Sequence, residues 1–90
     1  MIRRLIVHGR VQGVWYRGWT VDQAGALGLD GWVRNRTDGT VEILVSGPGD
    51  AIAAFVARCR QGPAAAEVER IEETDGEEMP AKGFTQRPTA

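Results

Sequence analysis

One apolar stripe constrains the fold of this chain more than any other feature. Four apolar side chains recur at positions i, i+3, i+4 and i+7 of a helix: Ile52, Phe55, Val56 and Cys59. This spacing places them on a single helix face. Asp50 stands where a capping residue would begin the helix, and Gly62-Pro63 predicts its end. Because a helix with one apolar face must bury it against another layer, the rest of the chain has to supply that layer.

Short alternating segments predict a sheet as the second layer. Asp38-Gly39 is a strong hairpin signal between strands expected at Gly31–Arg36 and Val41–Val45. Val41, Ile43 and Val45 then share one face of their strand. Further strands are expected at Arg3–Gly9 with Leu5 and Val7 on one face, at Glu67–Glu73 and, as a short edge strand, at Gly83–Arg87; residues 72–82 are expected to form an acidic loop.

A second helix is expected from about Arg17 to Leu27. Val21, Ala24 and Leu27 recur there at helical spacing, and Gly28 is a natural stop. The resulting order is strand, helix, strand, strand, helix, strand and a terminal strand. This order predicts an α+β fold of the ferredoxin-like, split βαβ kind, with one antiparallel sheet and two helices on one face. Ninety residues fit a single domain, 1–90.

Several classes of protein are disfavoured by composition. The longest N-terminal apolar run, Leu5-Ile6-Val7, is flanked by arginines and is too short for a membrane span or a signal peptide. No membrane association is expected, and the cytoplasm is the expected compartment. Cys59 is the only cysteine and His8 the only histidine, which leaves no disulfide and no thiolate or histidine metal cluster. A metal site built from carboxylates alone remains open, although no segment has the spacing of a calcium loop. We expect no metal and no cofactor.

The net charge is only −1, but positive and negative side chains are concentrated in different parts of the chain. Residues 1–36 carry six arginines against Asp22 and Asp30, whereas residues 67–78 carry seven acidic side chains against Arg70. A basic front half favours an anionic ligand over bulk nucleic-acid binding, which usually needs a larger excess of positive charge.

The segment from Gly9 to Arg17 is where an anion would bind. It joins an expected strand to an expected helix, at the end where the helix has unpaired N–H groups and a positive dipole. Its glycines allow successive amides to point inward, and Arg17 adds a planar guanidinium that matches phosphate oxygens. On spacing alone, an ordinary strand–helix connection with a solvated Arg17 remains open.

Two motifs resemble those of a known family. The run Gly9-x-Val11-Gln12-Gly13-Val14-x-Tyr16-Arg17 resembles the first signature of the acylphosphatases. The run Gly31-Trp32-Val33-Arg34-Asn35-x-x-Asp38-Gly39-x-Val41-Glu42 resembles their second signature, and the two stand in the same order and spacing. The likeness continues through Ala24, Leu27-Gly28-Leu29, Gly62-Pro63 and Phe84, so it covers nearly the whole chain.

The resemblance implies a metal-independent hydrolase whose substrate is a small acyl phosphate. It implies two catalytic residues: Arg17, which would bind the phosphoryl group, and Asn35, which would position the attacking water. The implied phosphate-binding loop consists of Gly9, Arg10, Val11, Gln12, Gly13, Val14 and Trp15. Trp15 occupies a variable position, and its bulk would narrow the mouth of the site. Inorganic phosphate or sulfate would compete with substrate, and a monomer is expected.

Other interpretations of particular residues stay beside this one. A non-catalytic ferredoxin-like module for RNA or a protein partner would show aromatics on the central strands, which the first and third expected strands lack. A domain that binds phosphate without turnover is a third possibility, against which the presence of both Arg17 and Asn35 argues. Structural roles are expected for five further residues: Trp15, Tyr16 and Trp19 as packing aromatics, Cys59 as a core thiol and His8 as an outward-facing side chain or one with a hydrogen-bond partner.

Overall fold

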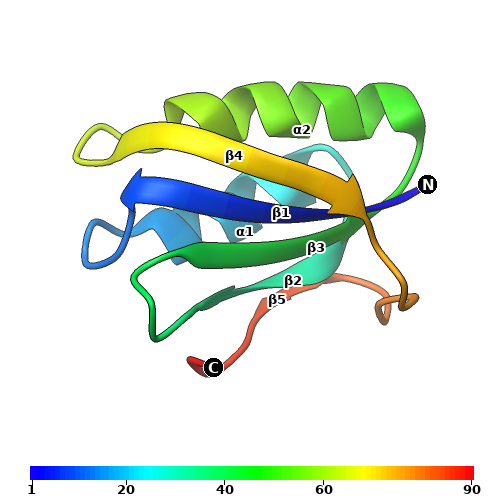
Figure 1. Cartoon of the computed structure of the whole chain (residues 1–90). Coiled ribbons are helices and arrows are strands. Elements are labelled where there is room, and N and C mark those ends of the chain that lie inside the picture. The colour runs from blue at the N-terminus through cyan, green and yellow to red at the C-terminus, as the bar shows by residue number, and fades with distance from the viewer.

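The computed structural model describes all residues, 1–90, as a five-stranded sheet with two helices. In chain order the elements are β1 (Ile2–Arg10), α1 (Tyr16–Ala26), β2 (Asp30–Asn35), β3 (Val41–Ser46), α2 (Gly49–Gln61), β4 (Glu67–Asp75) and β5 (Phe84–Gln86). The strand order is β4-β1-β3-β2-β5, and both helices lie on the same face (Figure 1). This confirms the expected ferredoxin-like α+β fold. Neither helix is long and apolar enough to cross a membrane.

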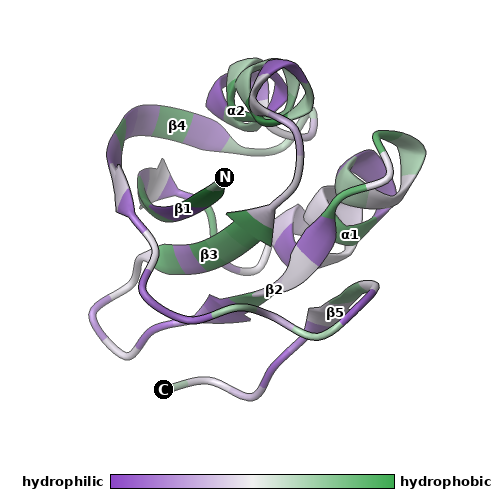
Figure 2. Ribbon diagram, turned by 90° about the vertical axis from the view of Figure 1, so that its right-hand side faces the viewer, coloured by the Kyte–Doolittle hydropathy of each residue, from purple (hydrophilic) through white to green (hydrophobic).

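The core lies between the helices and the sheet, as the view along the strands shows (Figure 2). The predicted stripe of α2 is confirmed, because Ile52, Phe55, Val56 and Cys59 are all buried. The strand residues of the same core are fully buried: Leu5, Val7, Val33, Val41, Ile43 and Val45. The other face of the sheet has no helix over it (Figure 2), and Arg4, Arg34 and Glu42 form ion pairs there.

The buried face of α1 differs from the prediction. It consists of Tyr16, Thr20 and Ala24, whereas Val21 and Leu27 are only partly buried. Residues at i, i+4 and i+8 share a helix face, so the three form one stripe. Thr20 is tolerated there because its hydroxyl donates a hydrogen bond to the carbonyl oxygen of Tyr16 at 2.7 Å.

The sheet is mixed, which corrects the expectation of an antiparallel sheet. Strands β1 to β4 pair antiparallel, but β5 runs parallel to β2, with Gly31 opposite Phe84. The cause is geometric. Strand β4 ends at the end of the sheet where β2 begins, so the chain crosses through residues 76–83 and returns in the direction of β2 (Figure 1).

Two local boundaries also differ from the prediction. Strand β4 continues to Asp75, so residues 72–75 are strand and not loop, because they pair with β1 and Arg3 forms ion pairs with Glu73 and Asp75. Asp50 does not cap α2. The cap is Pro48, and Asp50 lies in the first turn, where its carboxylate accepts from the N–H of Ala51 at 2.9 Å.

Candidate active site

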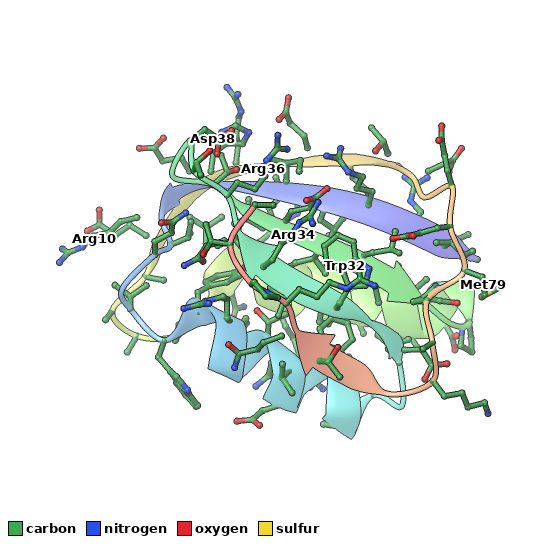
Figure 3. The ribbon with its side chains drawn as sticks, turned by 90° about the horizontal axis from the view of Figure 1, so that it is seen from below. Arg10, Trp32, Arg34, Arg36, Asp38 and Met79 are labelled. Carbon is green, nitrogen blue, oxygen red and sulfur yellow. The ribbon has the colours of Figure 1, made fainter.

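The link between β1 and α1 is shorter than expected, because β1 extends through Arg10. Gly9 therefore lies in the strand, at a bulge where the pairing with β4 shifts between His8 and Gly9. Its φ is 126°, and a Cβ atom there would lie 2.1 Å from the carbonyl oxygen of Glu67. Only glycine fits this position. Arg10 is exposed and projects away from the body of the protein (Figure 3).

Side chains of the loop anchor it to the rest of the fold. Val11 is buried in the core, and Val14 packs partly against it. The side-chain amide of Gln12 donates two hydrogen bonds, to the carbonyl oxygens of Arg36 at 2.8 Å and Thr40 at 2.9 Å. These contacts hold the loop against the turn between β2 and β3, which fixes where the start of α1 lies.

Arg17 and Asn35 line the same small pocket, whose volume is about 130 Å³. The other lining residues are Val11, Gly13, Trp15, Tyr16, Gly18 and Gln86. Among the residues expected in the site, the structure thus brings Val11, Gly13 and Trp15 together with Arg17 and Asn35. Gly9, Arg10, Gln12 and Val14 do not line the pocket.

The pocket lies at the N-terminus of α1 and is electropositive. The capping residue is Trp15, no side chain caps the helix, and the first turn holds no acidic residue. The first N–H groups of a helix have no partner within it and carry partial positive charge. Arg17 is the only charged residue that lines the pocket, and it pairs with no carboxylate. This arrangement suits an anion.

Asn35 ends strand β2 and is held by its backbone on two sides. It pairs with Val41 of β3, and its carbonyl oxygen accepts a hydrogen bond from the N–H of Ala90 at 3.1 Å. The side-chain Oδ1 is buried and has no hydrogen-bond partner. An unsatisfied buried acceptor is costly, and it is typical of a place where a ligand or a water binds.

Sequence reasoning missed Gln86 as a lining residue, although a signal for it exists. Side chains alternate along a strand, so residues two apart share a face. Phe84 packs against the core, 5.9 Å from Phe55 between ring centroids, and Gln86 therefore points to the same side of the sheet. The pairing of Gln86 with Val33 places it near Asn35.

The aromatics of this region divide into two groups. Tyr16 is 1% exposed and Trp19 packs partly against the core, which confirms the packing role expected for them. The same expectation is wrong for Trp15, which is 64% exposed. Its backbone is left-handed, with φ 65° and ψ 22°, and this conformation turns the side chain out of the core.

The remaining titratable candidates have structural roles. Cys59 is buried, and its burial raises the pKa of the thiol to about 12, so the thiol stays protonated at neutral pH as a core residue would. His8 lies with its Nε2 2.7 Å from Oε2 of Glu72, so this ring nitrogen has a hydrogen-bond partner. No group of three His, Cys, Asp or Glu side chains is arranged to hold a metal ion.

Comparisons with known proteins show which family the chain resembles. The family model for acylphosphatase matches residues 3–86. An acylphosphatase of Rhizorhabdus wittichii is 55% identical over 87 residues, which cover 97% of this chain and 88% of that protein. One of Azorhizobium caulinodans is 58% identical over 77 residues, covering 86% of this chain and 83% of that protein. The crystal structure of acylphosphatase from Bacillus subtilis superposes with a TM-score of 0.89 at 38% identity, covering 97% of this chain and 99% of that one. The chain belongs to the acylphosphatase family.

Proposed function

We propose that this chain hydrolyses the carboxyl–phosphate bond of acyl phosphates to a carboxylate and inorganic phosphate, by attack of water and without a metal ion. The observation that carries the proposal is the pocket that joins Arg17 and Asn35 to the uncapped N-terminus of α1. It combines positive charge with an unsatisfied acceptor in a volume of about 130 Å³.

Arg17 and the amides of the first helical turn bind the phosphoryl group. The guanidinium can donate two parallel hydrogen bonds to phosphoryl oxygens, and the converging N–H groups neutralise further negative charge. Because no carboxylate lines the pocket, nothing there repels the anion. The same groups stabilise the charge on the phosphoryl oxygens as the transition state forms.

Asn35 positions the attacking water. Its buried Oδ1 accepts a hydrogen bond from the water and leaves the water oxygen aimed at phosphorus. A neutral amide suits this task because it orients water without repelling an anion. Water forms the new bond to phosphorus, the bond from phosphorus to the acyl oxygen breaks, and the carboxylate leaves with the bonding electron pair. One proton of the water stays on the phosphate as P–OH, and the other passes to solvent.

The chemistry requires no metal and no general acid in this proposal. A carboxylate is weakly basic, so it departs without being protonated. Charge neutralisation, which a metal ion supplies in many phosphoryl transfers, is assigned here to Arg17 and the helix amides. Inorganic phosphate and sulfate are expected to compete for the same groups. We further propose that the enzyme is a monomer and acts in the cytoplasm.

The RNA-binding alternative has less support. A ferredoxin-like RNA-binding sheet presents accessible aromatics on its central strands. The one aromatic on the open face of this sheet is Trp32 of β2, which is 5% exposed and lies beside Arg34 (Figure 3). The guanidiniums of Arg34 and Arg87 lie over its ring, 4.7 and 4.5 Å from the ring centroid. It is therefore not free to stack on a base.

Two substitutions test the division of labour between the catalytic residues. Arg17→Ala should raise KM and collapse kcat, and Arg17→Lys should restore little, because a point charge does not reproduce the two-pronged guanidinium. Asn35→Ala should leave the Kd of inorganic phosphate nearly unchanged and lower kcat by about 10²-fold or more. Steady-state kinetics with benzoyl phosphate and phosphate inhibition give both quantities, with Arg70→Ala, an exposed arginine of β4, as the matched control.

Two results would contradict the proposal. If Asn35→Ala kept a normal kcat, or lost phosphate binding as severely as Arg17→Ala, the assignment of the water to Asn35 would be wrong. If exhaustive EDTA treatment abolished turnover and a divalent ion restored it, the metal-independent mechanism would be wrong.

A further inference from the structure

The pocket of Arg17 and Asn35 opens to solvent beside Trp15, which is 64% exposed. In the proposed function, Arg17 and the first helical amides bind the phosphoryl group and Asn35 binds the water. The acyl group of the substrate must then lie beside these groups, at the rim of the pocket. The residues of the rim therefore decide which acyl groups bind well.

Trp15 is the only large apolar side chain that the pocket exposes. It is 64% exposed, whereas the other apolar lining residues, Val11 and Tyr16, are each 1% exposed and belong to the core. The remaining lining residues are glycines or polar side chains. An apolar acyl group at the rim thus finds hydrophobic surface at the indole and nowhere else.

The backbone of Trp15 is strained for a residue of its kind. It is the only residue other than glycine with a positive φ, at 65°. A bulky side chain in the left-handed region is energetically unfavourable, and such strain persists mainly at ligand sites. Burial of the indole in the core does not offset this strain, because most of the ring is exposed. A role at the site accounts for both observations.

The indole of Trp15 lies against Gly18. A Cβ atom at Gly18 would lie 2.2 Å from Nε1 of Trp15, so the ring rests directly on the first turn of α1. Gly18 leaves the space that this contact needs. The indole therefore presents its exposed surface beside the first turn of α1, next to the groups that bind the phosphoryl group.

We infer that Trp15 determines substrate specificity by binding the acyl group, and that it favours acyl phosphates with an aromatic or large apolar acyl group over acetyl phosphate. The inference rests on the proposed function, because it takes the phosphoryl site as given. A stacked or edge-on aromatic pair changes an equilibrium by about three- to tenfold beyond area burial. That range is the preference expected from the indole.

The test is a ratio of specificities. We would measure kcat/KM for benzoyl phosphate and for acetyl phosphate in wild type, Trp15→Gly and Trp15→Phe. Glycine removes the indole and accepts the left-handed backbone, and Phe keeps a ring. Any change in the phosphate-binding groups alters both substrates alike and cancels in the ratio. Trp32→Phe, which changes a tryptophan of the open sheet face outside this pocket, is the matched control.

The ratio of benzoyl to acetyl phosphate should fall about three- to tenfold in Trp15→Gly. It should be largely retained in Trp15→Phe and unchanged in Trp32→Phe. The inhibition constant of phenylphosphonate relative to that of inorganic phosphate should shift by the same factor in Trp15→Gly, which tests the inference without turnover. Unchanged ratios in both assays would overturn it and leave the proposed function standing. A wild type that hydrolyses neither substrate would instead refute the proposed function.

Discussion

Replacing Tyr16 by Phe isolates one hydrogen bond that joins the two helices beside the site. The Tyr16 hydroxyl donates to the carbonyl oxygen of Cys59 at 2.7 Å, and both residues are buried. In a continuing helix this carbonyl would accept from the residue four positions later, which here is Pro63 and has no N–H. The Tyr16 hydroxyl therefore satisfies the last turn of α2 from outside.

The loss of this one hydrogen bond sets how far Tyr16→Phe lowers the free energy of unfolding. Because the ring of Tyr16 stays in place in Tyr16→Phe, no side-chain cavity opens, and the cost is that of a buried carbonyl left without a partner. Such a group costs about 1–3 kcal/mol. A domain of ninety residues is stable by roughly 5–14 kcal/mol, so the loss is a large fraction. A change of about 2 kcal/mol lowers the Tm by roughly 8–16 °C in a domain of this size.

Urea denaturation at pH 7, supported by a thermal scan, measures this loss. Thr20→Val is the matched control. It also removes a buried hydroxyl from α1, but the acceptor of that hydroxyl, the carbonyl oxygen of Tyr16, lies inside the helix and keeps its backbone partner. We expect Tyr16→Phe to cost clearly more than Thr20→Val. Equal costs, or a Tyr16→Phe variant within about 0.5 kcal/mol of wild type, would refute the capping argument.

Three further predictions follow from the packing and the charges. Phe55→Ala should lower the free energy of unfolding by about 3–5 kcal/mol through cavity formation, and an unchanged Tm would contradict this. Burial alone would raise the pKa of Glu42, but the guanidiniums of Arg34 and Arg4, each at 2.7 Å, outweigh it and lower the pKa below 4.5. The stability that Glu42 contributes is thus present above pH 4.5 and is lost as the pH falls through the lowered pKa of the folded state. Glu42→Gln should therefore weaken the dependence of the free energy of unfolding on pH below pH 4.5. Identical pH profiles for the variant and wild type would contradict this. Deleting residues 88–90 removes the Ala90 contacts of Asn35 and Thr37, and should lower kcat by up to about tenfold while the Kd of inorganic phosphate stays the same, which kinetics and phosphate titration would check.

The elements that sequence predicted correctly are those set by local rules. The stripe of α2 needs only the period of a helix, and the hairpin needs only Asp38-Gly39 between two alternating segments. Gly39 has a φ of 93°, which is the conformation such a turn requires. These signals lie within a few residues of each other, so no knowledge of the rest of the chain is needed to detect them.

The features that sequence missed depend on contacts between distant segments. The parallel pairing of β5 follows from where β4 ends in the sheet, and no local pattern near Phe84 contains that information. The buried face of α1 includes Thr20, whose hydroxyl donates a hydrogen bond within the helix. A polar residue type usually indicates exposure, so the sequence pattern did not predict that Thr20 is buried. Trp15 is large and apolar, which favours burial, yet its left-handed backbone turns it outward.

Few of the arginines in the first third of the chain are available to an anionic ligand in the folded protein. The excess of arginines in the first third indicated an anionic ligand, but most of these arginines are neutralised locally. Carboxylates pair with four of the six: Arg3, Arg4, Arg34 and Arg36. Arg10 projects away from the body of the protein (Figure 3). Only Arg17 lines the pocket, on the helix-covered side and apart from the acidic strand β4. The acidic strand β4 neutralises only Arg3, through Glu73 and Asp75, whereas Glu42 of β3 pairs with Arg4 and Arg34. These ion pairs leave a single guanidinium, that of Arg17, as the positive side chain that an anion meets in the pocket.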